Sequence, residues 1–312
     1  MAILAMDLGG TKIAVAVFST SGEILFHDTI LLNNEIGQTV GNLITTQVKK
    51  QIQDHAIDSI GISVPGISRQ KSGTVWAPNI PGWEDYPLLN EVKDVAGDMP
   101  VSIDSDRACS IFGEQWQGNA KDCNDVIFMA VGTGIGAGIV ANGSLIRGSE
   151  DIAGAVGWMA LCNPFESKYI QCGCFEYYAS GEGIPRLTRE ILQSNNEPSI
   201  LRKIQSNLLT AHDVFDAYEK NDLVSSIVID ECIAYWGMAS ANLVSIFNPS
   251  KIIFGGGIFG PADKFIDKIK KEATKWAQPI SISSVVFEKS ALGVSAAVYG
   301  AGYLALKKNR EI

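Results

Sequence analysis

A carboxylate, a hydroxyl and an amine stand close together near the start of the chain, around a pair of glycines. Asp7 ends an apolar run, Gly9 and Gly10 follow it, and Thr11 and Lys12 come directly after. Glycine permits a positive φ, and without a Cβ its backbone N–H groups can close around an anion. Carboxylate and hydroxyl oxygens beside phosphates suit a nucleotide with its Mg²⁺ ion. The segment therefore predicts a nucleotide phosphate site, with Mg²⁺ near Asp7.

A second stretch repeats this pattern in outline. Gly132, Thr133, Gly134 and Gly136 lie between two apolar runs. Apolar runs on both sides of a short glycine turn are typical of a β-hairpin. Either turn alone fits an ordinary hairpin, because short glycine motifs are common, but the pair with its polar groups favours phosphate binding. Neither turn has the Walker spacing, and neither opens a helix as a dinucleotide-binding motif does.

Asp106 is the candidate for a catalytic carboxylate. It follows the predicted strand 100–103 and precedes the predicted helix 107–117, whose dipole favours an ionised carboxylate there. Such a group can take the proton of a reacting hydroxyl. The alternative is a helix cap, a role that Ser105 or Asp106 could fill without any chemistry.

Two other predicted buried strands, 58–64 and 251–254, are closely followed by glycine. Sites of α/β sheets lie at such strand ends, and glycine lets a flat or anionic ligand approach the backbone. The loop 73–89 offers the Asn79 amide as donor and acceptor, although its tryptophans could equally pin it as an ordinary surface loop. The glycines at these two strand ends are Gly66, Gly255, Gly256 and Gly257.

These residues need a scaffold of strands and helices to bring them together. The predicted strands are 3–7, 13–18, 22–31, 58–64, 100–103, 126–131, 137–140 and 251–254, and the predicted helices are 37–53, 107–117, 223–247, 262–277 and 291–306. This order predicts an α/β fold. A chain of 312 residues exceeds the usual size of a single core, so we expect two domains, separated in the polar connector 118–125.

Composition excludes several classes of protein. The hydrophobic content of 46% and the charged content of 19% are those of a soluble globular protein, and the net charge of −9 argues against nucleic acid or an anionic membrane as a partner. The apolar runs are shorter than a membrane span and no signal peptide is recognisable, so we expect a cytoplasmic protein. The six cysteines are then expected to be reduced thiols.

In this order the motifs resemble the ROK family of sugar kinases and repressors, over nearly the whole chain. The most specific pieces are DLGGTK at 7–12, GTGIGAGIV at 132–140, GCFEYYASG at 173–181 and NPSKIIFGGGI at 248–258. The resemblance implies the actin-like ATPase (ribonuclease H-like) fold, with two α/β domains around a central cleft. It also implies a homodimer that uses ATP and Mg²⁺ to phosphorylate a small-molecule sugar.

Position by position, the resemblance assigns the two hairpin turns to the phosphates and the third glycine cluster to the adenosine. Asp106 corresponds to the family's catalytic carboxylate. The expected sugar contacts are Gly66, Asn79, Ser105, Asp106, Trp158 and Glu176. The expected nucleotide contacts are Asp7, Gly9, Gly10, Thr11, Lys12, Gly132, Thr133, Gly134, Gly136, Gly255, Gly256 and Gly257.

The sugar half of the family pattern is altered in this chain. Ser105 stands in place of the Asn before the catalytic Asp, and Ala155 and Trp158 replace the Glu and His of the Gly-Glu-x-Gly-His signature. That His also binds structural zinc in the family, with cysteines of which only Cys174 remains, so we expect no structural zinc. Trp158 could pack in the core or offer an aromatic face to the sugar. The zinc-ligand positions without a family ligand are Trp158, Ser167 and Tyr169.

We expect residues 1–118 to form the domain with Asp106, residues 119–290 the domain with the adenosine site, and residues 291–312 a helix that packs back on the first domain. The expected reaction is transfer from ATP to a hydroxyl, the 6-hydroxyl, of a hexose or hexose derivative, with a sugar preference unlike that of glucokinases. One alternative is a repressor, although the family's repressors carry a helix-turn-helix before the first hairpin, which starts here at Ala2. The other is a binding protein without catalysis, against which the retained Asp106 argues.

Overall fold

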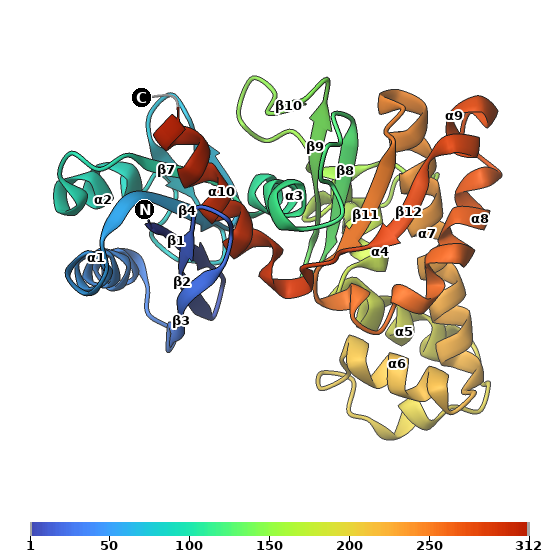
Figure 1. Ribbon diagram of the computed structural model, residues 1–312. Coiled ribbons are helices and arrows are strands. Elements are labelled where there is room, and N and C mark those ends of the chain that lie inside the picture. Colours follow the sequence, from blue (N-terminus) through green and yellow to red (C-terminus); the bar gives the residue numbers. More distant parts are fainter. Residues whose placement is uncertain (1, 311–312) are drawn as a thin grey trace. The chain divides into compact units, whose positions relative to one another are not determined.

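The structure is a computed structural model that describes residues 2–310, with side chains up to residue 308 (Figure 1). It divides into two compact units. Unit 1 contains the chain up to Cys123, the segment Leu145–Ala153 and the chain from Val294 onward, and unit 2 contains Asn124–Ser144 and Gly154–Gly293. The sequence analysis places the divisions at residues 118 and 290, and it does not anticipate that the segment 145–153 joins the first unit.

Unit 1 is built on a five-stranded sheet with the order β3-β2-β1-β4-β7. β1 pairs antiparallel with β2 and parallel with β4, and β4 pairs parallel with β7. The carboxyl ends of β1, β4 and β7 therefore meet at one edge, where sites of α/β sheets form. The strands are β1 (Ala2–Leu8), β2 (Lys12–Ser19), β3 (Ile24–Leu31), β4 (Ile57–Val64) and β7 (Val101–Ser105).

Helices cover both faces of this sheet. Successive residues of β1 point to opposite faces: Leu4 and Met6 share a core with α1, whereas Ile3 and Ala5 pack against α10. α10 also packs closely on α3 (Figure 1). The helices of unit 1 are α1 (Gly37–Asp54), α2 (Leu88–Ala96), α3 (Asp106–Gln117) and α10 (Ala296–Arg310), and the small sheet formed by β5 (Ile67–Arg69) and β6 (Thr74–Trp76) adjoins them.

Unit 2 has a second five-stranded sheet, with the order β10-β9-β8-β11-β12, and one core that joins the sheet to its helices. Its strands are β8 (Val126–Val131), β9 (Ile135–Ala141), β10 (Ser144–Leu145, whose second residue belongs to unit 1), β11 (Lys251–Gly255) and β12 (Val286–Lys289). Its helices are α4 (Cys174–Ala179), α5 (Gly183–Ser194), α6 (Ala211–Glu219), α7 (Leu223–Phe247), α8 (Ile266–Thr274) and α9 (Pro279–Ser284).

The expected α/β fold and both glycine hairpins are confirmed. The predicted helix 223–247 has the same bounds in the structure, but α2, α9 and the short strands β5, β6, β10 and β12 were not predicted from the sequence. The sequence analysis also held that no segment is long enough to span a membrane, which needs correction. α7 is long and apolar enough to qualify, but 56% of its most apolar window is buried, as in the core helix of a soluble protein.

Candidate active site

The register of unit 1 sets three polar side chains in a row at the edge of the sheet. Asp7 of β1 pairs with Ser63 of β4, and Ser63 pairs with Asp104 of β7. The Ser63 hydroxyl donates a hydrogen bond of 2.6 Å to Oδ1 of Asp7. Asp106 follows two residues after Asp104, as the first residue of α3. Strand pairing alone therefore gathers these carboxylates, which are far apart in the sequence.

Ser105 and Asp106 have different surroundings. Ser105 is buried, and its hydroxyl caps α3 by accepting a hydrogen bond of 3.3 Å from the Ala108 N–H. The half-buried Asp106 carboxylate accepts a hydrogen bond of 2.8 Å from the Arg107 N–H. The capping role that the sequence left open thus falls to Ser105, and the Asp106 carboxylate keeps lone pairs for a ligand.

Burial perturbs both acids. It raises the pKa of Asp7 from its usual 3.8 to about 6; the neighbouring Asp106 raises the pKa further, while the Ser63 hydrogen bond and Lys12 oppose the shift. Burial likewise raises the pKa of Asp106, and the adjacent Arg107 moderates the rise. Two half-buried carboxylates with raised pKa values at one strand edge form the kind of arrangement that marks a functional site.

The first glycine turn lies beside this pair of acids. The Gly9 N–H donates to the Lys12 carbonyl oxygen at 2.9 Å, which closes the turn, and Gly10, Thr11 and Lys12 are exposed. A Cβ added to Gly10 would lie 3.8 Å from the Cβ of Asn79. The expected phosphate turn and the expected sugar loop are therefore neighbours.

Gly66 lies near the start of α3 in the same unit. Its φ is +92°, and its carbonyl oxygen accepts a hydrogen bond of 3.1 Å from Arg107. Unit 1 thus brings together the expected residues Asp7, Gly10, Asn79 and Gly66 with Asp106.

The glycines of the two hairpin turns were expected to adopt a positive φ, and the structure differs from this expectation. The residues with positive φ include Gly256, but no glycine of the two hairpin turns. At Gly134 the lack of a side chain matters instead, since an added Cβ would lie 2.7 Å from Oε2 of Glu176. The argument from positive φ therefore holds for the third cluster and is wrong for both hairpins.

The second turn opens on a cavity of about 520 Å³ within unit 2. Gly132 and Thr133 form part of its wall, and Gly257 lies in the same wall although more than a hundred residues separate it from them. Two of the three predicted nucleotide segments thus share one cavity. Its remaining lining residues are Gly181, Glu182, Pro185, Arg186, Arg189, Leu209, Thr210, Ala211, His212 and Ile258.

Glu176 supports the second turn. Its Oε2 accepts a hydrogen bond of 2.7 Å from the Ile135 N–H, and the carboxylate fills the space that Gly134 and Gly157 leave open. Burial raises the pKa of Glu176, while the Ile135 hydrogen bond opposes the rise. The sequence analysis gave Glu176 a sugar contact only and did not detect this backbone role, which no local pattern signals.

The segment around Trp158 contains the positions at which the family resemblance implies zinc ligands. Trp158 is 56% exposed, so the core role considered for it is wrong. The Sγ atoms of Cys162 and Cys174 lie 2.6 Å apart, and the Tyr169 hydroxyl is hydrogen-bonded to Glu166 at 2.8 Å. Among residues 2–308 no three His, Cys, Asp or Glu side chains are grouped to hold a metal ion. The absence of structural zinc stays a prediction.

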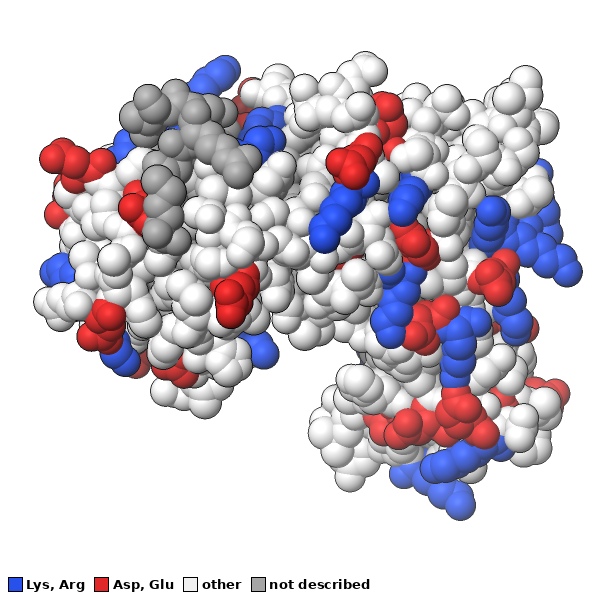
Figure 2. All heavy atoms as spheres, in the orientation of Figure 1, with Lys and Arg blue, Asp and Glu red and all other residues white. Residues whose placement is uncertain are grey.

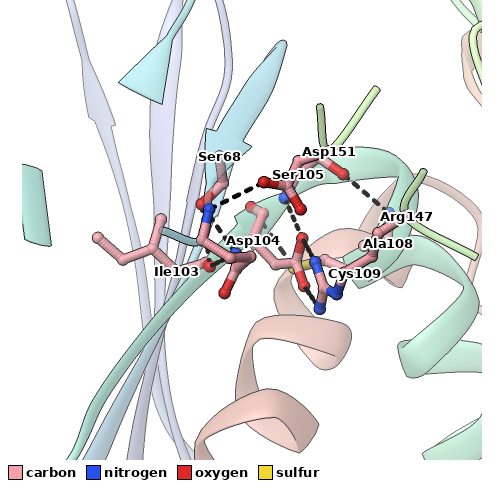
Figure 3. A network of polar contacts seen from close by, with 9 residues as sticks. Ser68, Ile103, Asp104, Ser105, Ala108, Cys109, Arg147 and Asp151 are labelled. Carbon is pink, nitrogen blue, oxygen red and sulfur yellow. Dashed lines mark hydrogen bonds and ion pairs between the residues drawn. The ribbon is translucent and has the colours of Figure 1, made fainter. Parts of the chain in front are cut away.

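Asp104 and Arg147 form an ion pair that the sequence analysis missed (Figure 3). The Arg147 guanidinium donates to both carboxylate oxygens of Asp104, at 3.0 and 2.5 Å. The Asp104 side chain is 3% exposed. A buried aspartate two residues before Asp106 could have been recognised as needing a cation, but nothing in the sequence names Arg147 as the partner.

Comparisons with known proteins find similar sequences and structures over nearly the whole chain, in both units. A model of the ROK family matches residues 3–308. A glucokinase from Halalkalibacterium halodurans is 32% identical, over 98% of this chain and 96% of its own length. A beta-glucoside kinase from Listeria monocytogenes is 28% identical, over 96% and 97%. The crystal structure of a ROK family glucokinase from Streptomyces griseus, in complex with glucose and AMPPNP, matches with a TM-score of 0.80 and 27% identity, over 98% of this chain and 100% of that one.

Proposed function

Because the chain belongs to the ROK family and is an ATP-dependent sugar kinase, we propose that it transfers the γ-phosphoryl group of ATP to the 6-hydroxyl of a hexose or hexose derivative other than glucose. The placement of Asp7 near the end of β1 and of Asp106 directly after β7, at one edge of the sheet, carries this proposal. Phosphoryl transfer has a loose transition state, so it needs positioning and charge stabilisation more than covalent chemistry.

Asp106 is proposed as the base that accepts the proton of the sugar hydroxyl. Its carboxylate receives one backbone hydrogen bond and stands beside Arg107, which favours the ionised form needed for that role. Its raised pKa brings the group closer to neutral pH, where a general base is most effective. Asn79, beside the first turn, is proposed to bind a sugar hydroxyl.

Asp7 fits a divalent cation. Ser63 donates one hydrogen bond to its carboxylate, which leaves further lone pairs for a cation, and the exposed first turn follows closely in the chain. When bound with ATP, Mg²⁺ would neutralise charge on the phosphate oxygens. The N–H groups of both hairpin turns are proposed to bind the phosphates, and the cavity lined by Gly257, Arg186 and Arg189 the nucleoside.

The sugar preference is proposed to differ from that of glucokinases. Hydrogen bonds to charged groups contribute roughly 1.5–3 kcal/mol each, and Ala155 and Trp158 can supply neither a carboxylate nor an imidazole. The exposed indole of Trp158 instead offers an apolar face, to which a sugar with fewer hydroxyls or a substituent is suited. The similarity to a beta-glucoside kinase agrees with a glycoside as one such substrate.

A panel of hexoses, epimers, N-acyl sugars and glycosides, assayed by coupled ADP release, tests this proposal. We expect kcat/KM for glucose to lie a few powers of ten below that for the preferred sugar, because two charged contacts are absent. Glucose as the best substrate, at an efficiency ordinary for sugar kinases, would contradict it. Binding of a sugar without turnover of any panel member would favour the binding protein that the sequence left as an alternative.

A further inference from the structure

The segment 145–153 is tied to the catalytic strand end of unit 1. Arg147 binds Asp104 through two parallel hydrogen bonds (Figure 3). Oδ2 of Asp151 accepts a hydrogen bond of 3.0 Å from the backbone N–H of Gln70. The Ala153 N–H donates to the Arg147 carbonyl oxygen at 2.9 Å, which closes the segment on itself. Two side-chain anchors and an internal turn thus hold nine residues that the chain inserts between two parts of unit 2.

The geometry of the ion pair is that of a strong contact. Asp104 is nearly inaccessible, whereas the Arg147 side chain is one-third exposed, so water competes little for the carboxylate. Two parallel N–H···O bonds from a planar guanidinium fix orientation as well as distance. Oδ1 of Asp104 also accepts a hydrogen bond of 2.8 Å from the Ser105 N–H.

The residue before Asp104 is held from the other side. The Ile103 carbonyl oxygen accepts hydrogen bonds of 3.1 Å from the Ser68 hydroxyl and from the side-chain amide of Gln70. The backbone from Ile103 to Ser105 is therefore constrained on both sides, and Asp106 is the next residue. Removal of Arg147 would leave Asp104 as a buried, uncompensated anion that must move toward water.

We propose that Arg147 is a positioning residue for Asp106. Through Asp104 it fixes the last residues of β7, and with them the direction of the Asp106 carboxylate. It also compensates the charge of Asp104, so that Asp7 and Asp106 do not share the strand edge with a third unpaired anion. The role of Asp106 as base belongs to the proposed function, and the inference about Arg147 rests on it.

Steady-state kinetics of Arg147→Met, Asp104→Asn and the double variant test this inference. We expect each single variant to lower kcat by about 10–100-fold, because small displacements of a base have effects of that size. The KM for ATP should change less than about twofold, since Arg147 and Asp104 are not among the proposed nucleotide contacts and do not line the cavity of unit 2. The double variant should be no slower than the slower single variant, because both residues act through one contact.

The double variant also covers the case in which a single variant fails to fold. It buries no unpaired charge, so its melting temperature should lie near that of the wild type while its kcat stays low. Arg147→Lys keeps the charge but not the paired geometry, and should give an intermediate kcat. Arg69→Met is the matched control: it removes the exposed Arg69–Asp85 ion pair of the same unit, and its kcat should stay within about twofold of the wild type.

Near-wild-type kcat in Arg147→Met or in the double variant would overturn the inference, as would effects of the two single variants that multiply in the double. Asp106→Ala distinguishes this failure from a failure of the proposed function. If Asp106→Ala is inactive and Arg147→Met is fully active, only the positioning role is wrong. If Asp106→Ala keeps its turnover, Asp106 is not the base and the inference falls with the proposed function.

Discussion

The Asp7 carboxylate is costly to the fold at neutral pH. Its pKa in the folded protein is about 6 against a usual value of 3.8, so the protonated form favours folding. That contribution is complete below pH 3.8 and is lost as the pH rises through 6. Asp7→Asn removes the charge, and without Mg²⁺ it should raise the free energy of unfolding at pH 8 by about 1–2 kcal/mol. This is less than the pKa shift alone would give, because solvent screens the charge of a half-buried carboxylate.

Thermal melts of wild type and Asp7→Asn at pH 8 and at pH 4, in the presence of a chelator, measure this effect. The variant should melt at a higher temperature at pH 8, and the difference should shrink at pH 4. A variant that melts lower than the wild type at pH 8 would show that the carboxylate is stabilised by contacts that outweigh its burial.

Asp106 should be needed for the reaction but not for nucleotide binding. We expect Asp106→Ala to lower kcat by about 10²–10⁴-fold, the usual size of a general-base effect, while the affinity for ATP stays unchanged. Calorimetry with a non-hydrolysable ATP analogue, beside the coupled assay, separates the two quantities. Asp106→Asn is the isosteric control and should be as inactive, because an amide cannot take the proton.

For single residues, the sequence identifies which side chains could take part in chemistry, but not which side chains they contact in the fold. Asp7, Asp106 and the glycines could be found because they stand at the ends of apolar runs. The partners Ser63 and Arg147 could not, since each reaches its carboxylate through strand register or a distant loop. The same holds for the contact between Glu176 and Ile135, which spans 41 residues.

Among the elements, α10 is packed closely enough on α3 that a single methyl group matters. A Cβ added to Gly300 would overlap the Cys109 carbonyl oxygen, whereas one added to Gly302 would meet the rings of Phe18 and Trp116 at 3.0 Å. We expect Gly300→Ala to destabilise unit 1 by about 1–3 kcal/mol, because neither backbone can give way cheaply. Gly302→Ala is the matched control in the same helix.

Gly302→Ala should be nearly neutral, because rings can shift by a few tenths of an ångström and alanine favours a helix over glycine by about 1 kcal/mol. Thermal unfolding of both variants measures the contrast. Equal melting temperatures for the two variants would show that α10 can move away from α3 without loss.

The segment from Cys162 to Cys174 is organised by tyrosines and a lysine. Tyr169 shares a hydrogen bond of 3.0 Å with Tyr178, and the ammonium group of Lys168 lies 3.3 Å from Glu190. We predict that the purified protein carries no stoichiometric zinc, because a tetrahedral site needs four ligands that are not assembled here. Metal analysis checks this, and about one zinc per chain would point to Cys162, Cys172 and Cys174 as ligands.

The elements that the sequence analysis missed are of two kinds. α2 shows a readable signal, since Leu88, Val92 and Ala96 repeat every fourth residue and are buried. The analysis assigned its first residues to the preceding loop. β12 has four residues and is a strand because it pairs with β11, and α9 has six residues, so neither is long enough to show a period.

Across the whole molecule, 25 Lys and Arg residues against 34 Asp and Glu residues give the net charge of −9. On the face drawn in Figure 2, Lys and Arg stand beside Asp and Glu over much of unit 2, without a continuous basic patch.

The division of the chain into two units could be predicted from the sequence only in part. Composition indicates a boundary in the connector 118–125, and the structure divides the chain at 123/124. Within unit 1, the segment 145–153 contacts distant residues through the side chains of Arg147 and Asp151. Such contacts leave no trace in composition or periodicity.

The packing of α10 on β1 also bears on how the protein is made. The ribosome releases β1 before α10, so the face of the first sheet with Ile3 and Ala5 stays uncovered until α10 has been synthesised. Unit 2, almost one continuous stretch, can complete its core in the meantime. The nascent chain can thus complete the cavity of unit 2 before α10 covers this face of the sheet that bears Asp7 and Asp104.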